Sequence, residues 1–291
     1  MADKLGIILA GGSATRLRPV TTVVSKQLLP VYDKPVIYYP LTTLILAGFS
    51  EIALISTPQA LPLYKQLFGD GSVLGLQIHY VEQERPNGLA QALILTEHLI
   101  QERPSALILG DNLFHGSQFG HKLSELQPTV GAKVFAYAVD NPSEFGIVTF
   151  DDAGKAITIE EKPINPASHW AIPGFYFYDG SASKRAHSVK PSARGEYEIT
   201  DLNRTYLDDG LLNVEKIPRG TAWLDLGNPD GLLDAGEYVR TLQKRQGVPI
   251  GSPEEAAWRM GFISESDFRN IVDQQPNPHY KNILRKAIEI K

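Results

Sequence analysis

The amino-acid sequence predicts an α/β fold in which a mostly parallel, mixed sheet carries helices on both faces. Three observations support this prediction. In the first half, short apolar runs alternate with segments of helical periodicity, which is typical of parallel strands joined by crossover helices. In the second half, strand-like segments connected by turns indicate a β-rich portion built onto the same sheet. The chain then ends in helical patterns.

The individual elements follow from apolar spacing and from breaker residues. The expected strands of the first half lie at 5–10, 52–56, 78–81 and 106–109, with helices at 36–47, 61–68 and 88–99. The β-rich half has strands at 133–139, 147–150, 157–160 and 175–178, and helices follow at 199–207, 230–245, 253–260, 265–271 and 281–288. Ligands of such sheets bind beyond the carboxyl ends of the strands, where Gly11 and Asp111 stand.

Composition excludes several classes of protein. The chain has 291 residues, of which 43% are hydrophobic, enough for a large core. The net charge of −5 comes from mixed charges without a basic block, so no nucleic-acid partner is expected. Cysteine is absent, which excludes disulfides and thiolate metal sites. The N-terminus lacks the pattern of a signal peptide, and the apolar runs are too short for a bilayer, so we expect a cytoplasmic protein without a membrane partner.

A glycine-rich turn follows the first predicted strand. Its backbone N–H groups can approach an anionic ligand, and two cations, Arg16 and Lys26, follow just downstream. This set suits a polyphosphate, although the glycines alone fit a plain tight turn equally well. Neither G-x-x-x-x-G-K-[ST] nor G-x-G-x-x-G occurs in the stretch, so a Walker A loop and a nicotinamide site lack motif support. The turn consists of Gly11, Gly12, Ser13, Ala14 and Thr15.

Two aspartates are candidates for a metal site. Asp111 directly follows the predicted strand 106–109 and Gly110, which places its carboxylate at the edge where ligands bind. One carboxylate binds Mg²⁺ weakly, so a second is expected, with phosphate oxygens and water completing the coordination. Asp225 is the candidate for the second. Taken alone, Asp111 could equally be a turn or cap residue, and for Asp225 a structural role is favoured.

The stretch from Gly11 to Pro30 resembles the signature of the sugar-1-phosphate nucleotidylyltransferases, G-G-x-G-T-R-L-x-P-x-T followed by K-x-L-x-P. Matching segments run in order from Gly6 to about Arg259. One departure is Ala14, which stands where the family has glycine. If this position requires positive φ, alanine strains the loop by roughly 1 kcal/mol.

The resemblance implies the family's Rossmann-like nucleotide-diphospho-sugar transferase fold. It also implies a nucleotidyltransferase domain over 1–240, with a nucleotide-binding half (about 1–130), a sugar-binding half (about 131–240) and a helical appendage at 241–291. Within the family the resemblance is to the branch that transfers a thymidylyl group from dTTP to glucose-1-phosphate, the first step of dTDP-deoxysugar synthesis. Its implied cofactor is Mg²⁺, held by Asp111 and Asp225.

The family's site residues carry over position by position. Arg16 and Lys26 would neutralise the leaving phosphates, and Lys162, in Glu-Glu-Lys-Pro, would hold the sugar phosphate as the third catalytic residue. The turn residues, together with Gln83, Gly88 and Asp111, would bind the nucleotide. The sugar phosphate would contact Leu89, Phe145, Gly146, Glu161, Lys162, Pro173, Arg194, Thr200 and Trp223.

Three departures from the family pattern are expected to cluster in the sugar pocket. Phe145, Pro173 and Leu226 each replace a residue with a side-chain hydroxyl, so the pocket could accept a less hydroxylated sugar. Neutral drift with an unchanged glucose substrate is the alternative.

The resemblance further implies a homotetramer and a second nucleotide-sugar site at a subunit interface, used for feedback. Its residues would be His115, Arg219, Gly251, Ser252, Glu255 and Arg259.

Other functions are left open by the residues. The same chemistry with UTP or another hexose-1-phosphate would use the same motifs, since a glutamine amide at Gln83 pairs equally with thymine and uracil. A non-catalytic, sugar-nucleotide-binding regulatory subunit would be expected to have lost at least one of five residues, all of which are present: Arg16, Lys26, Asp111, Lys162 and Asp225.

Overall fold

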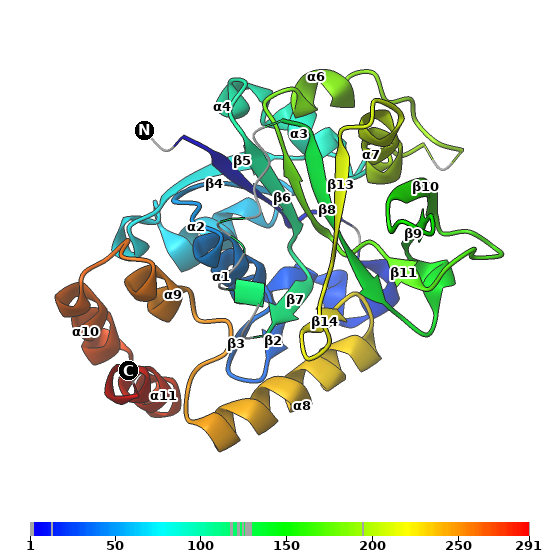
Figure 1. The fold of residues 1–291 in the computed structure, drawn as a ribbon. Coiled ribbons are helices and arrows are strands. Elements are labelled where there is room, and N and C mark those ends of the chain that lie inside the picture. Colours follow the sequence, from blue (N-terminus) through cyan, green and yellow to red (C-terminus); the bar gives the residue numbers. More distant parts are fainter. Residues whose placement is uncertain are drawn as a thin grey trace.

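The computed structural model describes residues 3–12, 14–116, 119–120, 123, 125, 130–193 and 195–290. One large mixed sheet runs through the molecule (Figure 1). Its parallel half consists of β5 (Gln77–Glu82), β4 (Glu51–Ser56), β1 (Leu5–Leu9) and β6 (Ser105–Leu109), in that order. The predicted parallel sheet of the first half is therefore confirmed.

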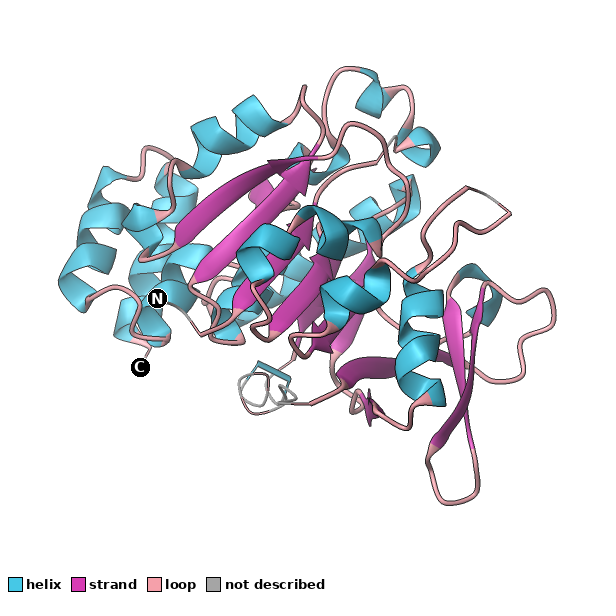
Figure 2. Cartoon of the chain, turned by 90° about the horizontal axis from the view of Figure 1, so that it is seen from above, coloured by secondary structure: helices cyan, strands magenta, loops and turns pink. Residues whose placement is uncertain are grey.

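The second half of the chain extends the same sheet, as predicted. β12 (Phe175–Tyr178) pairs antiparallel with β6, and β8 (Ala132–Ala138), β11 (Trp170–Ala171), β9 (Gly146–Phe150) and β10 (Ala156–Glu161) continue outward. β13 (Leu212–Lys216) pairs parallel with β8. The strands β9 and β10 form a hairpin at one end of the sheet (Figure 2).

Helices cover both faces of the sheet, and two hydrophobic clusters fill the spaces between (Figure 2). Adjacent residues of β1 belong to different clusters, because strand side chains alternate between faces. One cluster includes residues of α1 (Tyr38–Leu46), α2 (Leu61–Phe68), α9 (Pro253–Arg259), α10 (Glu265–Gln274) and α11 (Pro278–Glu289). The other includes residues of α3 (Gln91–Leu95), α6 (Ala182–Ala186) and α7 (Ile199–Asp208), and α4 (Glu97–Ile100) contributes Ile100.

The predicted helix at 88–99 is wrong at its start and is interrupted. Gly88 has φ +106°, and a side chain there would come within 2.4 Å of the Tyr197 carbonyl oxygen. The segment instead runs beside the 196–198 segment, and Ala90 N–H donates to the Tyr197 carbonyl. The helix begins only at Gln91 and breaks at Thr96.

Short elements were missed by the sequence reading. Two of them, β7 (Asn112–His115) and β14 (Ala222–Asp225), form an antiparallel ribbon beside the main sheet. Two others, β2 (Pro30–Val31) and β3 (Lys34–Pro35), form a small hairpin against α8 (Pro229–Gln246). Both pairs flank the region where the predicted phosphate and metal residues gather.

A buried polar network joins the β2–β3 hairpin to the C-terminal end of α8. Lys34 is 4% exposed; its ammonium pairs with the Asp33 carboxylate and donates to Gln243 Oε1 at 3.1 Å. Gln243 Nε2 donates to Asp33 Oδ2 at 2.8 Å, and the Ile250 N–H donates to Gln243 Oε1 at 2.9 Å. The rings of Tyr39 and Tyr280 flank the same ammonium. Burial lowers the pKa of Lys34, so its charge depends on these partners.

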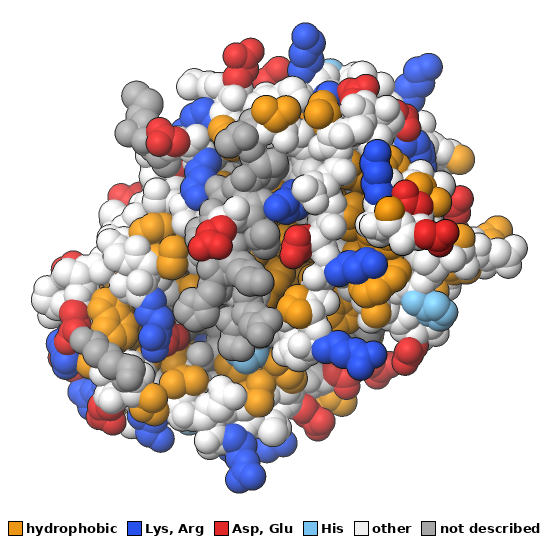
Figure 3. Space-filling model, in the orientation of Figure 1, with side chains coloured by type: hydrophobic (Ala, Val, Ile, Leu, Met, Phe, Trp, Pro, Cys, Tyr) orange, Lys and Arg blue, Asp and Glu red, His pale blue; other side chains and the backbone are white. Residues whose placement is uncertain are grey.

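The outer surface carries both signs of charge. On the face shown in Figure 3, acidic and basic side chains are intermixed over the described residues. Across the described part of the chain, no helix combines the length and the apolar character that a bilayer crossing requires.

Candidate active site

The glycine-rich turn leaves the carboxyl end of β1, as predicted. Gly11 has no room for a side chain, because a Cβ there would lie 2.6 Å from Gln83 Oε1. Ala14 adopts φ 44° and ψ 39°, the left-handed conformation in which the sequence reading expected an alanine to cost roughly 1 kcal/mol. The Thr21 hydroxyl donates to the Ala14 carbonyl at 2.8 Å and so supports this backbone. Ser13 lies outside the described residues.

The two predicted cations reach the end of the β7–β14 ribbon. The Lys26 ammonium forms an ion pair with the Asp111 carboxylate. The Arg16 guanidinium lies against Gly227, where a Cβ would come within 2.8 Å of Arg16 Nη2. Each cation sits in a short 3₁₀ turn, Thr15–Leu17 or Lys26–Leu28. Both side chains therefore converge on the predicted metal carboxylates.

The ribbon brings Asp111 and Asp225 together from distant parts of the sequence. Asp225 pairs with Asn112 in the ribbon register, and the Leu226 N–H donates to the Asp111 carbonyl at 2.9 Å. Burial raises the pKa of the Asp225 carboxyl and the Asp111 charge raises it further, while Lys26 and Arg16 lower it. Two carboxylates side by side thus carry an electrostatic cost that a bound cation would relieve.

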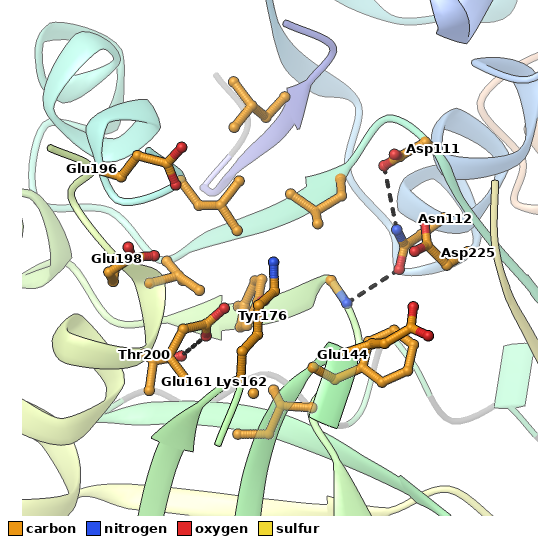
Figure 4. A pocket seen from close by; sticks show the side chains of 18 of the residues that line it. Asp111, Asn112, Glu144, Glu161, Lys162, Tyr176, Glu196, Glu198, Thr200 and Asp225 are labelled. Carbon is orange, nitrogen blue, oxygen red and sulfur yellow. Dashed lines mark hydrogen bonds between the residues drawn. The ribbon is translucent and has the colours of Figure 1, made fainter. Parts of the chain in front are cut away.

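The wall across the cleft is built around Glu161 and Thr200. The Thr200 hydroxyl donates to Glu161 Oε2, as Figure 4 shows. Gly146 makes room for this pair, because a Cβ there would lie 3.2 Å from Thr200 Oγ1. Lys162 follows Glu161 with φ 44°, and its N–H donates to the Phe145 carbonyl at 3.0 Å. These polar atoms form a surface suited to a hydroxylated ligand.

An aromatic pair closes one side of the cleft. The Phe145 and Trp223 rings meet edge to face, with centroids 5.0 Å apart. Phe145 therefore lines the predicted sugar side, and it presents an edge without a hydroxyl. Leu226 does not join it: this residue is 1% exposed and packs with Val31, Leu113 and Ala235. The expected cluster of three departures is thus wrong for Leu226.

The ion pair, the two aspartates, the Glu161–Thr200 pair and the aromatic pair all line one cleft of about 280 Å³ (Figure 4). Such a volume accommodates part of a nucleotide-sugar while leaving the rest at the opening. The predicted residues that line it are Gly11, Arg16, Lys26, Leu89, Asp111, Phe145, Gly146, Glu161, Lys162, Thr200, Trp223 and Asp225.

Other predicted residues lie near the cleft without lining it. Gly12 and Ala14 line an adjoining hollow of about 210 Å³, which shares Lys26 with the cleft. Gln83 is 2% exposed, and its amide donates to Gln91 Oε1 at 2.8 Å. Pro173 is buried between two lining residues, Ile172 and Gly174. Thr15 and Gly88 do not line the cleft, and Arg194 lies outside the described residues.

The sequence reading missed several residues of the cleft wall. Asn203 follows Thr200 by three positions on α7, so helical spacing alone would have placed both on one face. Its Oδ1 accepts from the Tyr178 hydroxyl at 2.7 Å, while Nδ2 has no partner in the described structure. Asn112 directly follows Asp111, and it faces the cleft because of the β7–β14 ribbon, which the sequence did not predict. The lining residues that were missed are Leu9, Gln27, Leu109, Asn112, Glu144, Ile172, Gly174, Tyr176, Glu196, Glu198, Ile199 and Asn203.

The residues predicted for a second site lie away from this cleft. His115 and Gly251 line one cavity of about 80 Å³, and His115 Nδ1 hydrogen-bonds the Tyr238 hydroxyl at 2.8 Å. Burial lowers the pKa of His115. Ser252 caps α9 by accepting from the Glu255 N–H, and Glu255 pairs with Arg259 at 2.7 Å. Arg219 is exposed and does not line that cavity.

Comparison with known proteins agrees with this geometry. The family model described as nucleotidyl transferase matches residues 5–241. A glucose-1-phosphate thymidylyltransferase of Mycolicibacterium smegmatis is 54% identical over 98% of this chain and 99% of its own length. That of Mycobacterium tuberculosis is 51% identical over the same shares.

A solved structure from Bacillus anthracis, described as a glucose-1-phosphate thymidylyltransferase in complex with a sucrose, has the same fold. It superposes with a TM-score of 0.75 at 36% identity, covering 81% of this chain and 95% of that one. The residues matched by the family model include the strands of the large sheet and the residues of the cleft, and the superposition confirms the predicted fold class. The chain therefore belongs to the nucleotidyl transferase family.

Proposed function

We propose that this protein transfers the thymidylyl group of dTTP to glucose-1-phosphate, giving dTDP-glucose and pyrophosphate. The observation that carries the proposal is the composition of one cleft. A glycine-rich turn with two cations, a carboxylate–hydroxyl pair, and the aspartates Asp111 and Asp225 all line it. Relatives at 51–54% identity over nearly the whole chain carry the name of this activity.

The reaction needs alignment and charge compensation more than proton transfer. A phosphate oxygen of glucose-1-phosphate attacks the α-phosphorus of dTTP in line; the bond from the α-phosphorus to the bridging oxygen breaks, and pyrophosphate leaves with that electron pair. The attacking oxygen is already anionic, so no general base is required. Because both reactants are polyanions, positioning and electrostatic stabilisation supply most of the rate enhancement.

The cations divide between the two phosphates. Arg16 and Lys26 stand beside the glycine-rich turn and offset charge on the leaving pyrophosphate. Lys162 lies next to Glu161 on the opposite wall and offsets charge on the incoming sugar phosphate. Lys26 pairs with Asp111, so phosphate oxygens would compete with this carboxylate for the Lys26 ammonium.

The residues fit Mg²⁺ as the metal. In the described part of the chain, no three or more Asp, Glu, His or Cys side chains gather as a metal site on their own. Asp111 and Asp225 offer two adjacent carboxylates on an open cleft, and Mg²⁺ typically takes one or two carboxylates with phosphate oxygens and water. Asp111 and Asp225 would hold the metal, which would supply positive charge beside the phosphates.

Substrate choice rests on the two ends of the cleft. Gln83 lies against Gly11 and must turn from Gln91 to read a pyrimidine edge, a role that fits thymine and uracil equally. Glu161 and Thr200 supply the polar atoms for hexose hydroxyls, while Phe145 leaves an apolar edge beside them. The proposed sugar substrate is therefore a hexose-1-phosphate, and glucose-1-phosphate is the first candidate.

Three further parts of the proposal come from the family resemblance. A homotetramer, a cytoplasmic location and feedback by a nucleotide-sugar complete the assignment. The cavity that joins His115 to Gly251 supports the location of the feedback site, since it lies between α1 and the ribbon, away from the cleft.

The test is pyrophosphate release with Mg²⁺ over a grid of nucleotides and sugars. dTTP, UTP, CTP, ATP and GTP are each paired with the 1-phosphates of glucose, galactose, N-acetylglucosamine and 6-deoxyglucose. The proposal expects the largest kcat/KM for dTTP with glucose-1-phosphate and a much lower value for Asp225→Asn at the same metal concentration. If kcat/KM is largest with UTP or with another sugar-1-phosphate, the substrate assignment is wrong. If folded protein releases no pyrophosphate with any pair, the proposed activity is refuted.

A further inference from the structure

We infer that Asn112 is the positioning residue that couples the metal carboxylate Asp111 to the sugar wall at Trp223. The inference rests on the proposed function and deepens it by naming how the two ends of the cleft are held in register. Asn112 is 2% exposed and belongs to the ribbon strand β7, between Asp111 and the core residue Leu113.

Every side-chain contact that the structure gives Asn112 leads to a residue of the cleft. Its Oδ1 accepts from the Trp223 indole N–H at 2.7 Å and from the Gly174 N–H at 3.2 Å. Its Nδ2 faces Asp111 Oδ1 at 3.4 Å (Figure 4). All three partners line the cleft, and they come from three separate segments of the chain.

The orientation of the Asn112 amide is fixed by its partners. Indole and backbone N–H groups only donate, so the carbonyl oxygen must face Trp223 and Gly174. The amide nitrogen then has to face Asp111, a carboxylate that only accepts when ionised. Rotating the amide by a half-turn would break all three contacts in a buried place, where unpaired polar groups are costly. The side chain therefore has one arrangement.

This arrangement connects two requirements of the reaction. Trp223 packs against Phe145 and defines where a hexose ring can lie. Asp111 defines where the metal and the nucleotide phosphates can lie. One rigid amide between them makes the sugar position and the phosphate position interdependent, and in-line attack needs both to be correct within a fraction of an ångström.

Two variants test the Asn112 contact with Asp111 separately from its contacts with Trp223 and Gly174. Asn112→Asp keeps an acceptor for Trp223 and Gly174 but replaces the donor that faces Asp111 by a second negative charge. Asn112→Leu has a similar size and removes all three contacts. The control is Asn213→Leu, an exposed asparagine on β13 that lines none of these cavities. All proteins are made also in a Trp170→Phe, Trp258→Phe background, which leaves Trp223 as the sole indole.

The readouts extend beyond turnover. We expect Asn112→Asp to raise the half-saturating Mg²⁺ concentration about 10- to 100-fold, the range for partners that orient metal ligands, with little change in metal-free Trp223 emission. We expect Asn112→Leu to shift that emission, to raise KM for glucose-1-phosphate and to lower kcat. Calorimetry with Mg²⁺ and a dTTP analogue that carries a methylene bridge between the α- and β-phosphates measures metal binding without any reaction.

The outcomes distinguish this inference from the proposed function. A wild-type protein that releases no pyrophosphate refutes the function, whereas the emission and calorimetric results still decide the role of Asn112. If Asn112→Asp binds Mg²⁺ like wild type, the inference is overturned. The same holds if Asn112→Leu lowers the melting temperature but leaves Trp223 emission and both KM values unchanged. If Asn112→Leu does not fold, the Asn112→Asp titration carries the test alone.

Discussion

Replacing Gln243 by leucine should destabilise the protein while leaving its chemistry intact. Gln243 is 3% exposed and makes three hydrogen bonds, to Lys34, Asp33 and the Ile250 N–H. Leucine has nearly the same volume but offers none of them. Lys34 and Asp33 keep each other as partners, so the variant loses hydrogen bonds without leaving a wholly unpaired charge.

The magnitude follows from the three lost contacts. At about 1 to 1.5 kcal/mol for each, the loss is about 3 to 4.5 kcal/mol. Burying the leucine side chain recovers about 1 kcal/mol, because it replaces a polar group by an apolar one. The expected net loss is about 3 kcal/mol, which corresponds to a fall in melting temperature of about 5 °C, since the entropy of unfolding is about 2.1 cal/mol/K for each of the 291 residues.

The assay combines calorimetric melting with pyrophosphate release at 25 °C. The matched control is Gln246→Leu, one turn further along α8 and exposed, where a change within about 0.5 kcal/mol is expected. A Gln243→Leu protein that melts within 2 °C of wild type would refute the reasoning, since the buried amide would then contribute nothing beyond its volume.

Three further outcomes are expected. Arg16→Ala should lower turnover by about two orders of magnitude or more without lowering the melting temperature, because the guanidinium stands at the cleft and not in the core; unchanged pyrophosphate release would remove it from the mechanism. Asp225→Asn should weaken the dependence of turnover on Mg²⁺ and should raise the melting temperature measured without metal. Burial and the Asp111 charge raise the pKa of Asp225, so its ionised carboxylate destabilises the folded protein once pH exceeds the unfolded pKa. A lower melting temperature in EDTA would contradict this. The pKa of Glu51 is shifted in the opposite direction, because the hydrogen bond from Arg103 holds it below the ordinary 4.5. The Glu51–Arg103 pair therefore stabilises the folded protein above pH 4.5, and this stabilisation is lost as pH falls through the folded pKa. The stability difference between wild type and Arg103→Met should therefore shrink from pH 7 to pH 3 in urea titrations, and a constant difference would argue against the pair.

The parts of the fold with strong local patterns could be predicted from sequence. The apolar run of β1 and the amphipathic spacing of α7 each determine an element without knowledge of its neighbours. Gly88 could not be assigned in this way, because its conformation is imposed by the Tyr197 backbone, which is distant in the sequence. A glycine at the start of an apolar helical pattern gives no local sign of such a contact.

The site shows the same division between local and long-range information. Gly11, Arg16, Glu161 and Lys162 belong to short sequence motifs, and these motifs were enough to assign them to the cleft. Asn112 acts through Trp223, a partner that only the β7–β14 register supplies. The error at Leu226 follows from the failure to predict the short strand β14. Leu226 adjoins Asp225 at the end of a strand, and neighbouring strand residues point to opposite sides, so the two could not both face the cleft.

The network around Lys34 also has a consequence during synthesis of the chain. Lys34 and Gln243 are 209 residues apart, so at typical translation rates roughly 10 to 40 s separate their appearance on the ribosome. During that interval the nascent chain holds a lysine and an aspartate whose burial awaits α8 and α11. The β2–β3 hairpin can therefore complete its buried contacts only after α8 and α11 have been synthesised. A chain terminated before α8 would leave the Lys34 and Asp33 side chains without Gln243 as a partner.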